Sequence, residues 1–145
     1  MKRIVLYSIL FIFSFRVIAL AQTTIEAKVD KTTLTTDETF TYKLTVTSSE
    51  RNMPLPQLPK FEGFEVLSQV RLSSMLLVKE EPQIKLSFVF ILTPTDIGNL
   101  KIEPSSIKIK DQTYSSESFQ IEVKESHLPK NIPSDINPQE PQINL

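Results

Sequence analysis

Apolar and polar residues alternate with a period of two along most of the chain after residue 22. Residues 25–29 and 40–46 place apolar side chains at every second position, and residues 84–92 continue the pattern. Shorter alternating segments occupy 107–109 and 119–123. Strict alternation is typical of antiparallel strands that bury one face against a core. The pattern predicts about seven or eight strands and no long helix.

Turn-forming residues separate the alternating segments. Short turns are predicted at residues 35–38 and 110–112. A hairpin turn is predicted at residues 79–83 and a longer corner at residues 94–99. The prolines of residues 52–59 remove backbone donors and predict an extended connector that passes from one sheet to the other. Tyr42 and Tyr114 are predicted at sheet edges. Together these features predict an all-β fold, an immunoglobulin-like antiparallel β-sandwich, over residues 22–125.

The N-terminus has the pattern of an export signal. Residues 1–21 join a basic pair to an apolar run at 4–15 and end in the small-residue motif Ala-Leu-Ala. This predicts a signal peptide that is cleaved before residue 22. Because Arg16 interrupts the apolar run, an uncleaved N-terminal anchor is the alternative. Both alternatives predict an exported protein, in the periplasm or on the outer face of the inner membrane.

The C-terminus departs from the strand pattern as well. Residues 126–145 contain four prolines, at positions 129, 133, 138 and 141, and isolated isoleucines in a polar background. So little apolar surface cannot form a core, which predicts a proline-rich disordered tail or linker.

Composition narrows the classes of function. Without the three basic residues of the predicted signal peptide, 13 of the 16 basic residues remain against 17 acidic ones, a net charge of −4. Nucleic-acid binding needs clustered lysine and arginine, so no nucleic-acid partner is expected. The chain has no cysteine. This excludes a lipid anchor on cysteine, thiol chemistry and cysteine-ligated metals.

The sequence contains few residues suited to catalysis. His127 is the only histidine and lies at the start of the tail, where neither a hydrolase triad nor a zinc site can form around it. Acidic pairs fall in predicted turns or at loop edges, namely Asp37 with Glu38, Glu62 with Glu65, and Glu80 with Glu81. They are interpreted as solvated residues, with general acid–base work as the alternative. A calcium site in the loops near Asp37 or Asp96 is a further alternative, because calcium takes oxygen ligands, but no ligand spacing there supports it. We expect a non-enzymatic protein with no cofactor and no metal.

Two segments are apolar on both faces, residues 75–78 and 88–92. One interpretation is a central strand whose outer face is covered by long neighbours. The other is an outward patch of Met75, Leu77, Val89 and Ile91 at which another domain or subunit docks.

The order of these segments resembles the BatD family of Bacteroides aerotolerance, or oxygen-tolerance, proteins. The resemblance covers residues 22–124 and is carried by the segments 25–30, 37–40, 55–64, 92–98, 100–104 and 114–116. It implies an exported, membrane-anchored protein of immunoglobulin-like domains. It also implies an envelope complex with von Willebrand factor A-domain membrane proteins and a MoxR-type ATPase, linked to tolerance of oxygen or other stress. No catalytic residues come with the resemblance.

The chain departs from the family pattern at two places. Family members usually continue through further β domains to a C-terminal transmembrane helix, whereas this sequence ends at Leu145. Membrane association is therefore expected through partners or through a missing C-terminal anchor, in a natural short form or a truncated protein. The family's Asn-Gly hairpin turn is replaced by residues 79–82, Lys-Glu-Glu-Pro.

Two functions follow from these features. The favoured one is a scaffold or protein-interaction module in a BatD-like envelope complex, which docks through a sheet edge or through the patch near Val89 and Ile91. The alternative is a soluble periplasmic module that binds a peptide or carbohydrate ligand in its loops. The absence of tryptophan weakens the carbohydrate variant.

Overall fold

The computed structural model describes residues 23–127, and every regular element in this range is a strand. The strands are β1 (Thr24–Val29), β2 (Thr33–Thr35), β3 (Phe40–Ser48), β4 (Phe64–Val78), β5 (Glu81–Pro94), β6 (Gly98–Ile102), β7 (Ser106–Ile109), β8 (Gln112–Ser115) and β9 (Phe119–Lys124). The prediction of an all-β, immunoglobulin-like sandwich is confirmed, with nine strands in place of seven or eight. The predicted signal peptide, and the predicted tail from residue 128 onward, lie outside the described residues. Among those residues, no helix has the length and hydropathy that crossing a membrane requires.

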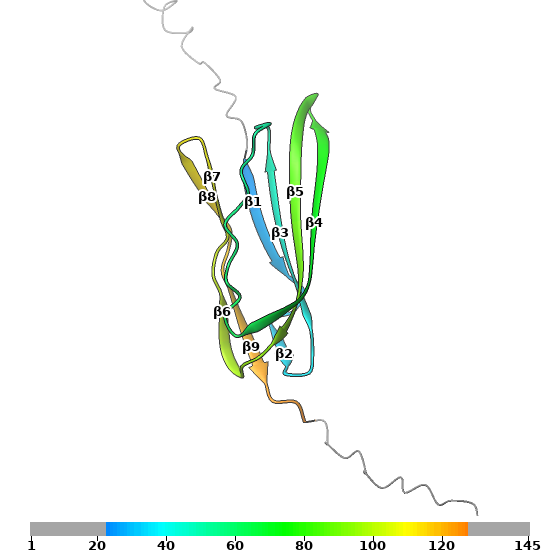
Figure 1. Cartoon of the computed structure of the whole chain (residues 1–145), viewed down its shortest axis with the longest axis vertical. Helices are drawn as coiled ribbons and strands as arrows, with labels where there is room; N and C mark the ends of the chain where they lie inside the picture. Colours follow the sequence, from blue (N-terminus) through cyan, green and yellow to red (C-terminus); the bar gives the residue numbers. More distant parts are fainter. Residues whose placement is uncertain (1–22, 128–145) are drawn as a thin grey trace, which may run out of the picture.

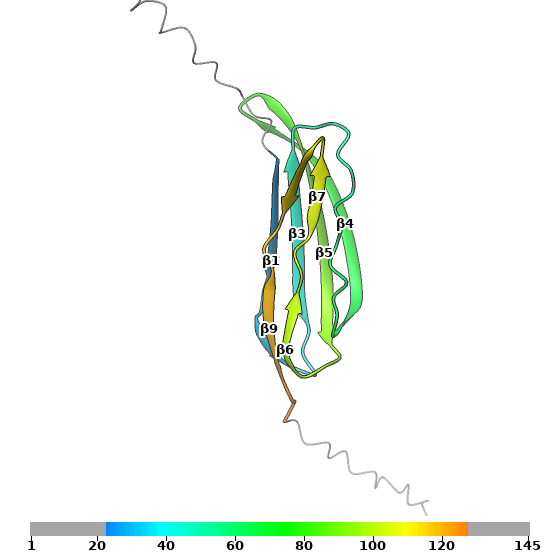
Figure 2. The ribbon, with the colours of Figure 1, turned by 90° about the vertical axis from the view of Figure 1, so that its left-hand side faces the viewer.

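The strands form two layers (Figure 1). The first layer is a four-stranded antiparallel sheet in the order β1-β3-β5-β4. The second layer combines the sheet β2-β9-β6 with the hairpin β7-β8, and Figure 2 shows it in front of the first layer. The predicted antiparallel pairing holds except between β2 and β9, which are parallel. A parallel pair is possible here because the two strands are far apart in the sequence and no tight turn joins them.

The core lies between the layers, and alternation decides which side chains enter it. Along β3 every second residue from Phe40 to Ser48 is buried, while the residues between them remain partly or fully exposed. Their neighbours on β5 are Leu86, Phe88, Phe90 and Leu92, all at most 5% exposed. Ile102 and Ile121 cover them from the second layer with no exposed area.

Tyr42 corrects one prediction, because it lies at the centre of the core and not at a sheet edge. Its side chain is fully buried, and its hydroxyl group shares a 2.9 Å hydrogen bond with the Ser105 hydroxyl. Its ring packs edge-to-face against Phe61 at a centroid distance of 5.2 Å. Burial raises the pKa of the Tyr42 hydroxyl. An interior position is possible because Ser105, in the loop between β6 and β7, provides a polar partner. Tyr114 is half-buried on β8.

The proline-rich connector also differs from its prediction. It joins β3 to β4, which belong to the same sheet, after passing along the second layer (Figure 1). Gln57 pairs there with Ser106 through two backbone hydrogen bonds of 2.7 and 3.1 Å. The chain then turns back at Phe61 and Gly63, which have φ of 52° and 82°. The connector therefore closes one flank of the sandwich and returns to the first sheet.

The hairpin between β4 and β5 has a loop of two residues. Lys79 and Glu80 have φ of 52° and 67°, and Val78 pairs with Glu81. Positive φ at both loop positions is the geometry of a type I′ turn, which matches the twist of the flanking strands. The turn is therefore shorter than the predicted range, and Pro82 lies inside β5 opposite Leu77.

Placing an Asn-Gly dipeptide in this loop, through the double substitution Lys79→Asn/Glu80→Gly, is expected to stabilise the domain. A left-handed conformation costs most L-residues about 1–2 kcal/mol each, a cost that glycine avoids and asparagine lessens. We expect a gain of about 1–2 kcal/mol in the free energy of unfolding, measured by urea denaturation. In the control Asn99→Gly, on β6, φ is not positive, so glycine should destabilise by about 0.5–1 kcal/mol. A loop variant no more stable than the parent would show that the turn carries no strain.

Candidate docking surface on the β4–β5 hairpin

The longest strands of the fold form its most exposed feature. β4 contains 15 residues, of which only Phe64 is buried. It lies at the edge of the four-stranded sheet, bonded to β5 on one side and, among residues 23–127, to no strand on the other. Figure 1 shows the hairpin tip extending beyond the neighbouring strands. The second layer leaves β4 open to solvent over almost its whole length.

The strand register assigns each hairpin residue to a face. Residues directly opposite each other in an antiparallel pair direct their side chains to the same side. Phe88 and Phe90 belong to the core, so their β4 partners Arg71 and Gln69 share the inner face. Val89 lies between those two phenylalanines and therefore points outward.

The four predicted patch residues divide between the two faces. Val89 and Ile91 lie on the outer face, where Val89 pairs with Val70 and Ile91 is 41% exposed. Met75 and Leu77 pair with Ile84 and Pro82, in phase with the inner face, near the hairpin tip. They are 71% and 77% exposed. The structure thus brings Val89 and Ile91 together and separates both from Met75 and Leu77.

The outer face of the hairpin carries a continuous apolar surface, which we call the outer patch. Its members are Val70, Leu72, Val89 and Ile91. Sequence reasoning missed Val70 and Leu72. Their i, i+2 spacing was a usable signal, but a β-bulge between Val66 and Ser68 interrupts the alternation along β4. The patch ends toward β3, where Lys43 lies opposite Val89.

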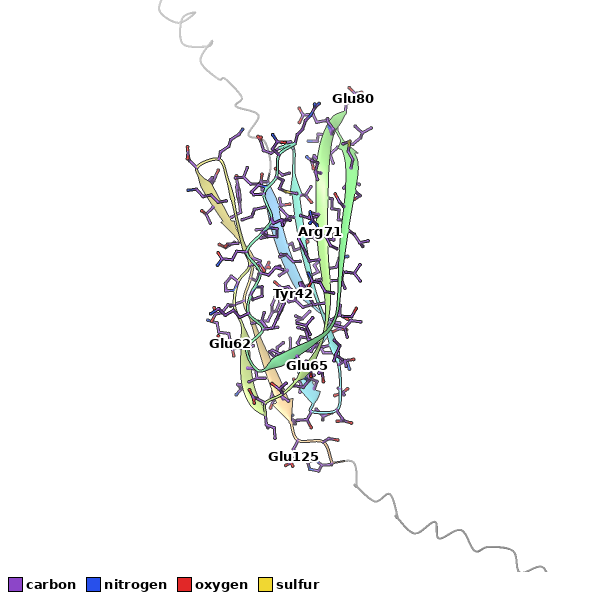
Figure 3. The ribbon with its side chains drawn as sticks, in the orientation of Figure 1. Tyr42, Glu62, Glu65, Arg71, Glu80 and Glu125 are labelled. Atoms are coloured by element: carbon purple, nitrogen blue, oxygen red, sulfur yellow. The ribbon has the colours of Figure 1, made fainter. Side chains whose placement is uncertain are left out.

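The inner face of the hairpin is polar in its middle. The guanidinium carbon of Arg71, which Figure 3 labels, lies 5.8 Å from the centroid of the Phe88 ring, within cation–π range. Gln69 and Ser73 flank Arg71 on the same face. These side chains interrupt the apolar inner face, so the outer patch is the continuous apolar surface of the hairpin.

The predicted acidic pairs lie at separate places in the fold. Asp37 and Glu38 hold the turn between β2 and β3. Glu38 accepts a hydrogen bond of 2.9 Å from the Thr35 N–H and one of 3.0 Å from Lys31 Nζ. The Thr35 N–H, followed by Lys31 and the Thr35 hydroxyl, lowers the pKa of Glu38. The Thr35 hydroxyl donates to Asp37 at 2.7 Å and lowers its pKa.

The remaining candidate groups do not converge on one point. Figure 3 shows Glu80 at the hairpin tip, far from Glu62 and Glu65 near the start of β4. His127 is exposed, with Nδ1 3.0 Å from the Glu125 carbonyl oxygen. In residues 23–127 no three histidine or acidic side chains are close enough to hold a metal ion.

A groove of about 730 Å³ lies between the connector and β6. Lys60 and Glu62 line it from the connector, and Asp96, Lys101 and Glu103 line it from the loops and strand opposite. Phe61 also borders the groove but is only 6% exposed. The groove is therefore open and mainly polar, with charges of both signs.

Comparison with protein families agrees with this architecture. The family model described as the BatD DUF11 like domain matches residues 27–123, which span the strands from β1 to β9. The chain belongs to the BatD family. No curated protein and no solved structure matches the chain significantly. The BatD domain thus comprises the whole sandwich, including the long hairpin, and membership associates the chain with the aerotolerance-related envelope proteins of this family.

Proposed function

We propose that this BatD domain is a non-enzymatic interaction module that docks through the outer patch to envelope proteins acting in oxygen or stress tolerance. The continuous apolar face of the β4–β5 hairpin supports this proposal most directly. Interface cores are depleted in charge and rich in apolar side chains, and isolated exposed apolar residues do not form such a surface.

Burial of the outer patch by a partner would contribute substantially to the free energy of binding. Burying a valine, leucine or isoleucine completely contributes about 1.5–3 kcal/mol. The patch residues are already about half buried, since Val70, Leu72 and Ile91 are 47%, 57% and 41% exposed. A contribution of about 1 kcal/mol from each of four side chains corresponds to nearly three orders of magnitude in the dissociation constant.

The proposed setting is outside the cytoplasm, in the periplasm or on the outer face of the inner membrane. The proposed partners are envelope proteins, including membrane proteins with von Willebrand factor A domains, and neither nucleic acid nor a cofactor takes part. Lys43 of β3 and Lys85 of β5 lie beside the outer patch, so a partner with an apolar centre and an acidic rim would fit it.

The test is a pull-down from detergent-solubilised envelope with the tagged mature chain and the variant Val89→Asp/Ile91→Asp. Loss of the partners recovered by the parent chain is the expected result. The matched control is Thr113→Asp/Ser115→Asp, which adds the same charge to exposed positions of β8 in the second layer, away from the patch. If the patch variant stays folded by circular dichroism and still recovers every partner, the docking role of the outer patch is excluded.

The groove beside the connector favours a second candidate function, a soluble module that binds a peptide. Its mixed charges suit a polar, extended ligand better than a carbohydrate, which usually stacks on exposed aromatic rings. Saturable binding on a peptide array that is lost in Lys101→Glu, while the pull-down brings down nothing, would favour this function over docking.

A further inference from the structure

Among residues 23–127 no strand pairs with the free edge of β4, so this edge presents backbone groups without a strand partner. A two-residue type I′ loop closes on a hydrogen-bonded pair, here Val78 with Glu81. Such pairs alternate along an antiparallel ladder, so the even-numbered residues of β4 direct their N–H and C=O groups to β5. The odd-numbered residues from Gln69 to Leu77 direct their N–H and C=O groups away from β5, in the plane of the sheet. Pro82 fits this scheme, since it lies opposite Leu77 in a pair that needs no N–H from it.

The edge of β4 lacks the features that usually protect a sheet edge. Natural edges are short, charged, covered or interrupted by proline. Residues 68–78 contain one charged residue, Arg71, and neither proline nor glycine. The opposite edge of the same sheet differs, because β1 carries Glu26 and Lys28 and its Ala27 N–H donates to the Glu117 carboxylate at 3.3 Å. In the second layer the edge strands β2 and β6 have three and five residues.

We propose that β4 pairs with β4 of a second copy of this chain, antiparallel across a two-fold axis at Ser74, to form a continuous eight-stranded sheet. This inference concerns the edge of the hairpin and goes beyond the proposed docking of its outer face. Strand addition at an edge joins main-chain groups, while the register determines which side chains meet.

The side chains select a second copy and this register. An axis at Ser74 places Val70 opposite Val78 and Leu72 opposite Leu76, so apolar residues of the outer face meet one another. These four residues are between 40% and 57% exposed in the single chain. The same axis places Arg71 opposite Leu77 and keeps the two Arg71 side chains apart.

Neighbouring registers are less complementary. In such a pair the odd-numbered residues, whose N–H and C=O groups point away from β5, must lie opposite odd-numbered residues of the other copy. The two-fold axis therefore passes through a residue position and not between two residues. An axis at Ser73 places Leu72 opposite Ser74, and an axis at Met75 places Leu76 opposite Ser74. An axis at Arg71 brings two like charges together, which opposes pairing. An axis at Leu72 places Val70 opposite Ser74, and an axis at Leu76 pairs only residues 74–78 of β4. An axis at Ser74 combines the apolar pairs Val70–Val78 and Leu72–Leu76 with separated charges.

The first test uses the absence of cysteine from the chain. In Ser74→Cys the two thiols meet at the axis in a non-hydrogen-bonded pair, where the Cα atoms lie about 4.5 Å apart, within disulfide range. Mild oxidation of the mature chain should convert most of Ser74→Cys into a covalent dimer. The control Ser68→Cys replaces an exposed serine on the same strand and face, far from the axis, and should form no covalent dimer.

The second test removes the pairing without removing the fold. Ser73→Pro deletes an outward N–H that β5 does not use, a position at which an edge strand accepts proline. Sedimentation at increasing concentration should show the parent chain dimerising and Ser73→Pro at least tenfold weaker. A parent chain that stays monomeric, or equal cross-linking of Ser74→Cys and Ser68→Cys, would overturn the proposal. Val89→Asp/Ile91→Asp should still dimerise, and Ser73→Pro should still recover envelope partners, so the two proposals fail separately.

Discussion

Replacing Tyr42 by alanine is expected to lower the free energy of unfolding by about 3–5 kcal/mol, the range for removing a large aromatic side chain from a core. The ring contacts Phe61, Phe90 and Phe119 at centroid distances of 5.2, 6.1 and 6.3 Å. These phenylalanines come from the connector, β5 and β9, so one side chain joins both layers and the connector. A domain of this size has roughly 5–15 kcal/mol of stability, and Tyr42→Ala removes a large part of it.

Smaller changes separate the ring of Tyr42 from its hydroxyl group. Tyr42→Phe leaves the buried Ser105 hydroxyl without its 2.9 Å partner and should cost about 1–3 kcal/mol. Adding Ser105→Ala removes both partners and should restore most of that loss. The control Tyr114→Phe loses an exposed hydrogen bond to Gln112 and should change stability by less than about 0.5 kcal/mol. Urea denaturation measures all four variants, and a Tyr42→Phe variant as stable as the parent would show that the pair contributes nothing.

The strands and the side each residue faces could be predicted from the sequence, because period-two alternation directly reports burial of one face. β3 is the clearest case, since each apolar residue from Phe40 to Val46 is buried and each polar neighbour is not. Alternation within a strand does not tell which strand lies at an edge. Tyr42 was therefore misplaced, since its interior position depends on the strand order and on Ser105, 63 residues further along.

The docking surface was only partly predictable for the same reason. Val89 and Ile91 were identified because a strand that is apolar on both faces is visible in one segment. That Met75 and Leu77 lie on the other face could be seen only from the register between β4 and β5. That register is determined by the two-residue turn at Lys79 and Glu80, which has no periodic signal. The unprotected edge of β4 is likewise a property of the strand order and not of the strand itself.

Ile91 and Leu92 offer a sharp test of the face assignment, because they are adjacent and point to opposite sides of β5. Leu92 is fully buried, opposite Phe40 of β3. Leu92→Asp is expected to abolish folding at 25 °C. A buried carboxylate without a partner costs several kcal/mol, and the lost packing adds about 2–5 kcal/mol, which together reach the stability of a small domain.

Ile91→Asp carries the same charge one residue away and should leave the domain folded. The Ile91 side chain is 41% exposed on the outer face, where water can solvate a carboxylate. We expect a loss below about 1.5 kcal/mol, mainly from the poor strand propensity of aspartate. Circular dichroism and thermal unfolding compare the two variants. If Ile91→Asp unfolded as completely as Leu92→Asp, the outer face would be part of a core, and the apolar residues there would serve folding and not docking.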